Sequence, residues 1–195
     1  YAHAASSWLT DGLLPVELSF RLPENGTIKN ALVFVIGGSH AGKRLTLNQW
    51  QELISNVALG TNPMVLLGGP GDQKLAQELA EEFDHLIDAT SYSVASGLTL
   101  IRDAAIVVSG DTGFMHAAAL LDTPLVSFWG ATHPNLGFAP WPVRSAQKEV
   151  ISKSIWTPMS KHGKKLPFLP NPMNKLLVSE VLSAIEQMLP DKTTP

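Results

Sequence analysis

A short polar segment, Asp111-Thr112-Gly113, stands between an apolar run and a stretch of small residues, with His116 one helical turn further on. A helix that begins here presents its first N–H groups unpaired, and such a helix start attracts an anion. The Thr112 hydroxyl and the Gly113 N–H can then bind phosphate oxygens, with His116 as a further donor. Taken alone, Asp111 or Thr112 can equally be a helix cap, and a lone histidine is more often a core residue.

A second group of polar residues lies in an earlier glycine-rich turn, from Gly37 to Arg44. Two glycines with four residues between them, followed by Lys43, match the spacing of a P-loop. A P-loop needs Ser or Thr next, to hold magnesium, but Arg44 stands there, so a P-loop-like NTPase is the less favoured alternative. We expect Lys43 and Arg44 to reach toward a diphosphate, with Ser39 in the same turn. A strand-to-helix turn with a surface lysine is the plain alternative.

A third turn, Gly68-Gly69-Pro70-Gly71, is followed by Asp72. Glycines permit positive φ and let a planar ligand approach the backbone closely. A carboxylate at the end of a strand can bind ribose hydroxyls, although Asp72 can equally be a plain helix cap.

Apolar runs and helical spacings between these turns define the elements that must position them. Thr46 and Gln49 form a capping box before apolar residues at helical spacing. Short, continuous apolar runs are typical of strands buried on both faces. We expect strands at 31–36, 64–67, 85–88, 106–109 and 125–129, and helices at 47–58, 72–83, 93–103 and 114–121.

This alternation predicts an α/β fold with a Rossmann-like, doubly wound parallel sheet. Residues 1–30 are predicted to be a linker, and 31–173 to form the nucleotide-binding domain. Proline and loss of periodicity indicate a long loop over 131–173, with one strand at 150–154. A final helix is expected at 174–189, capped by its first residue.

Composition narrows the functional classes. The chain has 195 residues, 45% of them hydrophobic and 16% charged, with a net charge of -3, so it lacks the general basic surface of a nucleic-acid-binding protein. It has no cysteine, which excludes disulfides and thiolate metal sites and fits a reducing, cytoplasmic compartment. No apolar run approaches the roughly 20 residues that span a bilayer.

Lys43-Arg44 after the first strand, a glycine-rich turn after the second, and the segment SGDTGFMHAAALLDTPLVSFWGATHP together resemble a known family. They are similar to the C-terminal domain of family 9 glycosyltransferases, the lipopolysaccharide heptosyltransferases. The resemblance covers about residues 31–140, and Asp-Thr-Gly-x-x-His is its most specific part. It implies one half of a GT-B fold, in which two Rossmann-like domains face each other across a cleft, and makes 1–30 a linker or a remnant of the N-terminal half.

The resemblance also implies roles for individual residues. Lys43 looks like the diphosphate-binding lysine of the family, and Thr112 and Gly113 look like its phosphate-binding turn. Asp111 and His116 look like sugar or phosphate contacts. This half would bind a nucleotide sugar such as ADP-heptose, without a metal or other cofactor.

Asp72 occupies the place of an acidic adenosine contact in the family.

No residue of this chain matches the family's catalytic base. That base belongs to an N-terminal domain absent from this sequence, as does the site for a lipid-linked saccharide acceptor. We therefore expect the donor-binding half of an inverting glycosyltransferase, inactive alone, with 174–189 packing toward the missing domain. A cytoplasmic protein, peripheral at the inner face of a bacterial inner membrane, is expected; a nucleotide-binding module without catalysis is the alternative.

Overall fold

Six parallel strands form one sheet in the order β3-β2-β1-β4-β5-β6. The computed structural model describes residues 28–57, 62–164 and 166–189, so the expected linker lies almost wholly outside the described residues. The strands are β1 (Leu32–Val35), β2 (Met64–Leu67), β3 (Leu86–Asp88), β4 (Ile106–Ser109), β5 (Leu125–Trp129) and β6 (Gln147–Ile151). This order is that of a doubly wound, Rossmann-like sheet, which confirms the predicted fold class.

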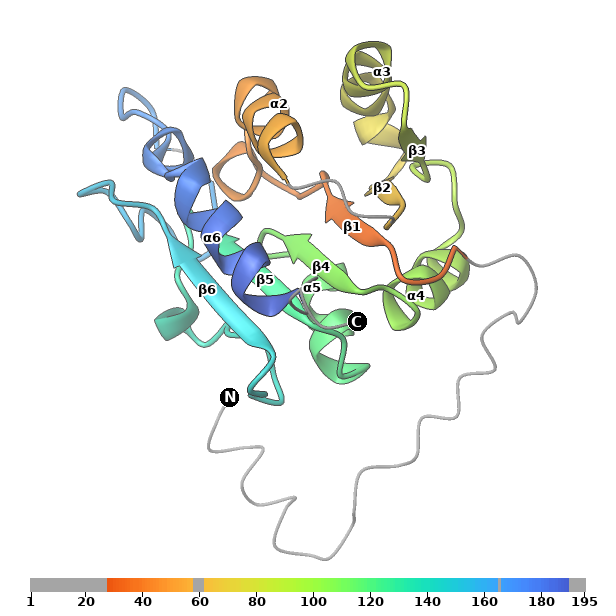
Figure 1. The fold of residues 1–195 in the computed structure, drawn as a ribbon. Helices are drawn as coiled ribbons and strands as arrows, with labels where there is room; N and C mark the ends of the chain where they lie inside the picture. Colours follow the sequence, from red (N-terminus) through yellow and green to blue (C-terminus); the bar gives the residue numbers. More distant parts are fainter. Residues whose placement is uncertain (1–27, 58–61, 165, 190–195) are drawn as a thin grey trace, which may run out of the picture.

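Within the described residues, five α-helices and four short 3-10 helices lie between the strands or, for η4 and α6, after the last strand (Figure 1). The α-helices are α2 (Leu47–Asn56), α3 (Gln73–Glu82), α4 (Val94–Arg102), α5 (Gly113–Leu120) and α6 (Val178–Met188). The 3-10 helices are η1 (Ala41–Lys43), η2 (Pro70–Asp72), η3 (Pro134–Leu136) and η4 (Pro172–Lys175). No helix in the described part of the chain is long and apolar enough to cross a membrane.

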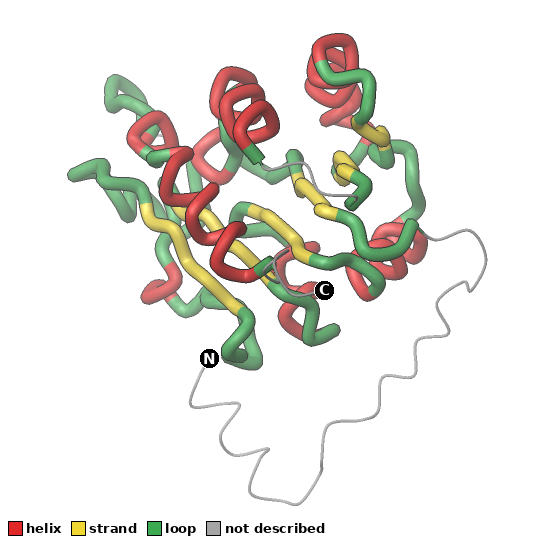
Figure 2. The backbone as a smooth tube through the Cα atoms, in the orientation of Figure 1, coloured by secondary structure: helices red, strands yellow, loops and turns green. Residues whose placement is uncertain are grey.

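Helices cover both faces of the sheet (Figure 2). Successive strand residues point to opposite faces, so Phe34 packs with Trp50 of α2 while Val33 lies in the cluster that holds Leu100 of α4. The Phe34 and Trp50 rings meet edge to face, 5.8 Å between centroids. Helices α2, α3 and α6 therefore lie on one face and α4 and α5 on the other. Burial on both faces explains why the inner strands are continuous apolar runs.

The last strand and the last helix differ from the expectation. β6 lies at Gln147–Ile151 rather than 150–154, because an edge strand paired only with β5 tolerates exposed polar residues. Helix α6 begins at Val178, not at Asn174, and its N-cap has no side-chain hydrogen bond. Asn171 instead caps η4 by accepting a hydrogen bond from the Met173 N–H.

The apolar face of α6 packs on this domain's own sheet. Val181 and Ile185 are buried in the same cluster as Phe128 of β5. The exposed apolar face that would have supported docking on another domain is thus not seen along α6 in the described chain. Its contact with an N-terminal domain stays a prediction.

Candidate functional site

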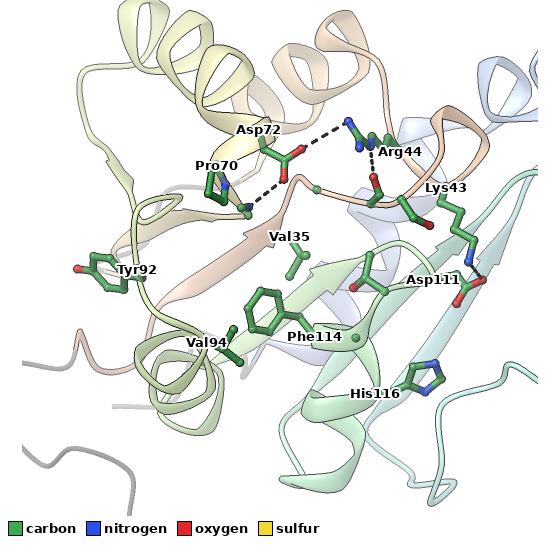
Figure 3. Close-up of a pocket in the computed structure, with 18 of the residues that line it drawn as sticks. Val35, Lys43, Arg44, Pro70, Asp72, Tyr92, Val94, Asp111, Phe114 and His116 are labelled. Atoms are coloured by element: carbon green, nitrogen blue, oxygen red, sulfur yellow. Dashed lines mark hydrogen bonds and ion pairs between the residues drawn. The ribbon is translucent and has the colours of Figure 1, made fainter. Parts of the chain in front are cut away.

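The order of the strands creates a crevice at the carboxyl edge of the sheet. From β1 the chain adds strands toward one edge of the sheet, up to β3, and from β4 it adds them toward the other edge, up to β6. The turns that follow the neighbouring strands β1 and β4 therefore lead away from each other and leave a crevice between them. A cavity of about 730 Å³ opens here, within the range of small-molecule sites. Its lining includes all eight residues predicted for the site: Ser39, Lys43, Arg44, Asp72, Asp111, Thr112, Gly113 and His116 (Figure 3).

Lys43, the last residue of η1, is held at one end of the cavity. Its Nζ lies 2.7 Å from Oδ2 of Asp111 and 6.0 Å from the centre of the Phe138 ring. Its aliphatic stem passes Gly163, where a Cβ would lie 2.5 Å from Lys43 Cε and where φ is +79°. Only glycine suits that position, because a side chain would strain the backbone and collide with the lysine.

The turn after β4 packs directly against η1. At Gly110 an added Cβ would lie 2.2 Å from the carbonyl oxygen of Lys43 and 2.9 Å from Cε2 of Phe128. Asp111 follows and is buried, with its carboxylate turned to Lys43 (Figure 3). Absence of a side chain at Gly110 therefore brings Lys43 and Asp111 together from turns far apart in the sequence.

Thr112 is the N-cap of α5. Its Oγ1 accepts a hydrogen bond from the Met115 N–H (3.2 Å) and lies 2.9 Å from Oγ of Ser109, which donates to the Gly110 carbonyl oxygen (2.9 Å). Each hydroxyl has one hydrogen, so the Thr112 hydrogen goes to Ser109. The hydroxyl is occupied within the protein, so the anion donors that remain here are the first N–H groups of α5, at Gly113 and Phe114, two residues that line the cavity.

His116 lies one turn further along α5, near the Lys43–Asp111 pair (Figure 3). Burial lowers the pKa of its imidazole below the ordinary value of 6.5, Asp111 opposes this change, and Lys43 adds to it. At neutral pH the ring is therefore uncharged, with one nitrogen as donor and the other as acceptor. An anion bound nearby would favour the protonated ring.

Asp72 and Arg44 join the first two glycine-rich turns. Nε of Arg44 donates to the Gly38 carbonyl oxygen (2.5 Å), and Nη1 lies 3.5 Å from Oδ1 of Asp72. The other oxygen of Asp72 accepts from the Gly69 N–H (2.9 Å). The side chain makes no capping hydrogen bond to α3, but this bond to the Gly69 N–H belongs to the capping box of η2. The helix-cap alternative therefore holds for η2, and the ribose contact stays a prediction. A Cβ at Gly37 would lie 2.4 Å from Oδ2 of Asp72, so the turns meet closely.

Besides Val35 and Pro70, which belong to an expected strand and turn, the cavity is lined by four side chains that sequence reasoning missed: Tyr92, Val94, Phe114 and Phe138. Tyr92, Val94 and Phe114 form an apolar end opposite Lys43 and His116 (Figure 3). Gly97 of α4 makes room there, since a Cβ would lie 3.0 Å from Cε1 of Phe114. Phe114 follows Gly113 directly, and Val94 begins the helix expected over 93–103, so both had a usable signal. Tyr92 and Phe138 come from irregular segments without periodicity.

The cavity thus combines the Lys43–Asp111 ion pair, a helix start and an apolar end. This arrangement suits an elongated ligand with an anionic part and a flat part.

Among the described residues, no group of three or more His, Asp or Glu could hold a metal ion. A P-loop would lead from its lysine into a helix, whereas Arg44 is extended and α2 begins only at Leu47, so the described geometry does not support that alternative. His133 follows β5 and caps η3 by accepting a hydrogen bond from the Asn135 N–H.

Comparison with known proteins gives a consistent result. Residues 11–167 match the family model "Glycosyltransferase family 9 (heptosyltransferase)". Lipopolysaccharide heptosyltransferase 1 from Salmonella typhimurium is 32% identical over 105 residues, which cover 53% of this chain and 33% of that protein. Its counterpart from Escherichia coli K12 is 31% identical over the same length.

Solved structures share the fold. The structure "E. coli heptosyltransferase WaaC with ADP" has a TM-score of 0.66 at 24% identity, over 86% of this chain and 46% of that one. E. coli ADP-heptose lps heptosyltransferase II also scores 0.66, at 20% identity, over 84% and 47%. A family 9 glycosyltransferase from Veillonella parvula scores 0.64 at 18% identity, over 96% and 51%. The chain thus spans about a third of the curated relatives and about half of the solved ones.

Proposed function

The chain belongs to glycosyltransferase family 9, and from that membership we propose that it is the C-terminal, donor-binding half of a GT-B glycosyltransferase. The proposed enzyme is inverting and moves a heptose-like sugar from ADP-heptose to a lipid-linked saccharide of the lipopolysaccharide core. The observation that carries the proposal is the meeting of Lys43, the start of α5 and His116 in one cavity at the reversal of strand order.

The proposed donor lies along the cavity in one direction. Its diphosphate sits between the Lys43 ammonium and the N–H groups at Gly113 and Phe114, where a cation and a helix start both favour negative charge. The adenine ring of the donor lies against Tyr92 and the apolar residues beside it. The name of one solved relative states that it holds ADP, which supports this choice of nucleotide.

The proposed reaction is a direct displacement. The acceptor hydroxyl oxygen forms a bond to the anomeric carbon while the bond from that carbon to the diphosphate breaks, and ADP leaves. In this chain Lys43, the α5 N–H groups and His116 stabilise the charge that develops on the diphosphate. A carboxylate of the N-terminal domain takes the proton of the acceptor hydroxyl. The site needs no metal, because the lysine and the helix start neutralise the leaving group.

The proposed location is the cytoplasm, at the inner face of a bacterial inner membrane. A nucleotide-sugar donor and an acceptor anchored in lipid meet at such a surface. A nucleotide-binding module without catalysis is the alternative for the chain alone.

Calorimetric titration with nucleoside diphosphates and their sugars tests the proposal. We expect ADP or ADP-heptose to bind most tightly, and to bind equally well with EDTA and without added magnesium. His116→Ala should weaken binding, while His85→Ala, an exposed histidine beside β3, should not. Magnesium-dependent ATP hydrolysis at ordinary NTPase rates would overturn the proposal in favour of a P-loop-like enzyme.

A further inference from the structure

The loop that follows β6, residues 152–171, exposes apolar side chains outside the cavity. We call it the post-β6 loop. Ile155 is 88% exposed, Phe168 is fully exposed, and Trp156 and Leu166 are more than 40% exposed. Its cyan and blue stretches project at the edge of the molecule beyond β6 and α6 (Figure 1). Isolated exposed apolar residues are ordinary, but four in one loop, two of them aromatic, indicate an interaction surface.

The same loop is the basic part of an acidic chain. It holds four lysines, at 153, 161, 164 and 165, and no Asp or Glu, whereas the rest of the chain has ten Lys and Arg against seventeen Asp and Glu. Lys153 pairs with Glu180 of α6 (2.5 Å). Lys161 and Lys164 are exposed and have no ion-pair partner among the residues that the structure describes. Unpaired positive charge and exposed apolar side chains therefore occur in the same loop.

The backbone of the post-β6 loop is fixed to the domain. The N–H groups of Met159 and Ser160 both donate to the Ala131 carbonyl oxygen, at 2.9 and 3.0 Å. Gly163 packs against Gly42, where a Cβ would lie 2.7 Å from the Gly163 carbonyl oxygen. The exposed side chains are thus presented by an anchored segment, beside the turn that carries Lys43.

We propose that the post-β6 loop docks this domain onto the surface of an anionic lipid bilayer. Trp favours the level of the headgroups, where its ring meets both apolar and polar surroundings, and Phe inserts at the boundary with the acyl chains. Lysines attract anionic lipids and extend their ammonium groups to the headgroups. A protein partner covering the same loop would have to bury the Lys161 and Lys164 ammonium groups, which is costly without paired carboxylates. This docking rests on the membrane location proposed above and assigns it to the post-β6 loop, but it does not depend on which ligand fills the cavity.

Co-sedimentation of the chain with vesicles tests the docking. Vesicles containing phosphatidylglycerol should bind the chain, added salt should weaken binding, and vesicles of phosphatidylcholine alone should bind poorly. The charge variant is Lys161→Glu/Lys164→Glu, and its control is Lys29→Glu/Lys74→Glu. The apolar variant is Trp156→Ser/Phe168→Ser, and its control is Trp141→Ser. Trp141 is 64% exposed but lies outside the loop. Circular dichroism and unfolding midpoints identify any variant that fails to fold.

We expect each loop variant to reduce the vesicle partition constant by about tenfold or more, and each control to change it little. Absence of binding to phosphatidylglycerol vesicles, or equal binding by folded loop variants, would overturn the proposal. Self-association of the chain that Trp156→Ser/Phe168→Ser abolishes would assign the loop to a second copy instead. Loss of vesicle binding in a longer form with an N-terminal half would assign the loop to that half.

Discussion

At the scale of single residues, Lys43 is the main cation of the cavity. Its ammonium faces the buried Asp111 carboxylate at 2.7 Å, and Gly163 confines its stem. Lys43→Gln should reduce the affinity for ADP by about tenfold or more, because it removes a charge-assisted contact and leaves Asp111 to repel the phosphates. Calorimetry measures the change.

The matched control for Lys43 is Lys74→Gln, which neutralises a lysine whose side chain is 90% exposed on α3. It carries the same change of net charge, so a general electrostatic effect would weaken both variants equally. Equal affinities for ADP in Lys43→Gln, Lys74→Gln and the parent chain would remove Lys43 from the site.

His116 gives a prediction for pH. Burial lowers the pKa of its imidazole in the folded state, so the unfolded chain binds a proton at a higher pH than the folded chain does. The free energy of unfolding should therefore fall as the pH drops below 6.5 toward the lower folded pKa, and His116→Gln should reduce this dependence. Denaturant unfolding at a series of pH values measures the slope.

The pKa of His116 also reports on the ligand. Titration of its ring proton by NMR should give a value below the ordinary one in the free chain, and saturation with ADP should raise it, because a nearby phosphate favours the imidazolium. A pKa that ADP leaves unchanged would place the phosphates away from His116.

At the scale of elements, the turn after β4 positions Lys43 through the backbone. Gly110→Ala should lower the free energy of unfolding by about 1–3 kcal/mol, since the new methyl group meets the Lys43 carbonyl oxygen and Phe128. It should also weaken ADP binding, because η1 must move. Denaturant unfolding and calorimetry test both effects. Gly71→Ala is the matched control for stability, since an added Cβ there meets no atom of the protein within 4 Å; equal losses of unfolding free energy in the two variants would contradict the argument.

The same elements explain what the sequence predicts well. Thr46 and Gln49 form the predicted capping box in full, and α2 begins at Leu47 as expected. β2, β4 and β5 have the predicted bounds, because strands buried on both faces are continuous apolar runs. The eight site residues meet because parallel strands bring the turns that follow them to one edge.

The bounds of β6 and α6 and some side chains of the cavity could not be predicted from the local sequence pattern. β6 carries Lys148 and Glu149 at an exposed edge, so no apolar run marks its start. The start of α6 has no capping side chain for a pattern to detect, and Asn171 caps η4 instead. Tyr92 and Phe138 reach the cavity from irregular segments, where only tertiary packing decides which side chains face inward.

At the scale of the whole molecule, donor binding and sugar transfer should separate. The chain covers 46% of one solved relative, and we propose that its cavity stabilises a diphosphate, while the proposed base belongs to an N-terminal domain. We therefore expect the 195-residue chain to bind ADP without acceptor-dependent release of ADP from ADP-heptose. A longer form that carries an N-terminal half should release ADP when a lipid-linked saccharide is supplied.

In that longer form, Lys43→Gln should lower kcat as well as donor affinity, because charge develops on the departing diphosphate beside Lys43 in the transition state. Reactions without acceptor measure hydrolysis of the donor and serve as the baseline. Acceptor-dependent release by the 195-residue chain alone would show that it supplies its own base. Such a result would point first to Asp111, the buried carboxylate next to Lys43, as the group that accepts the proton.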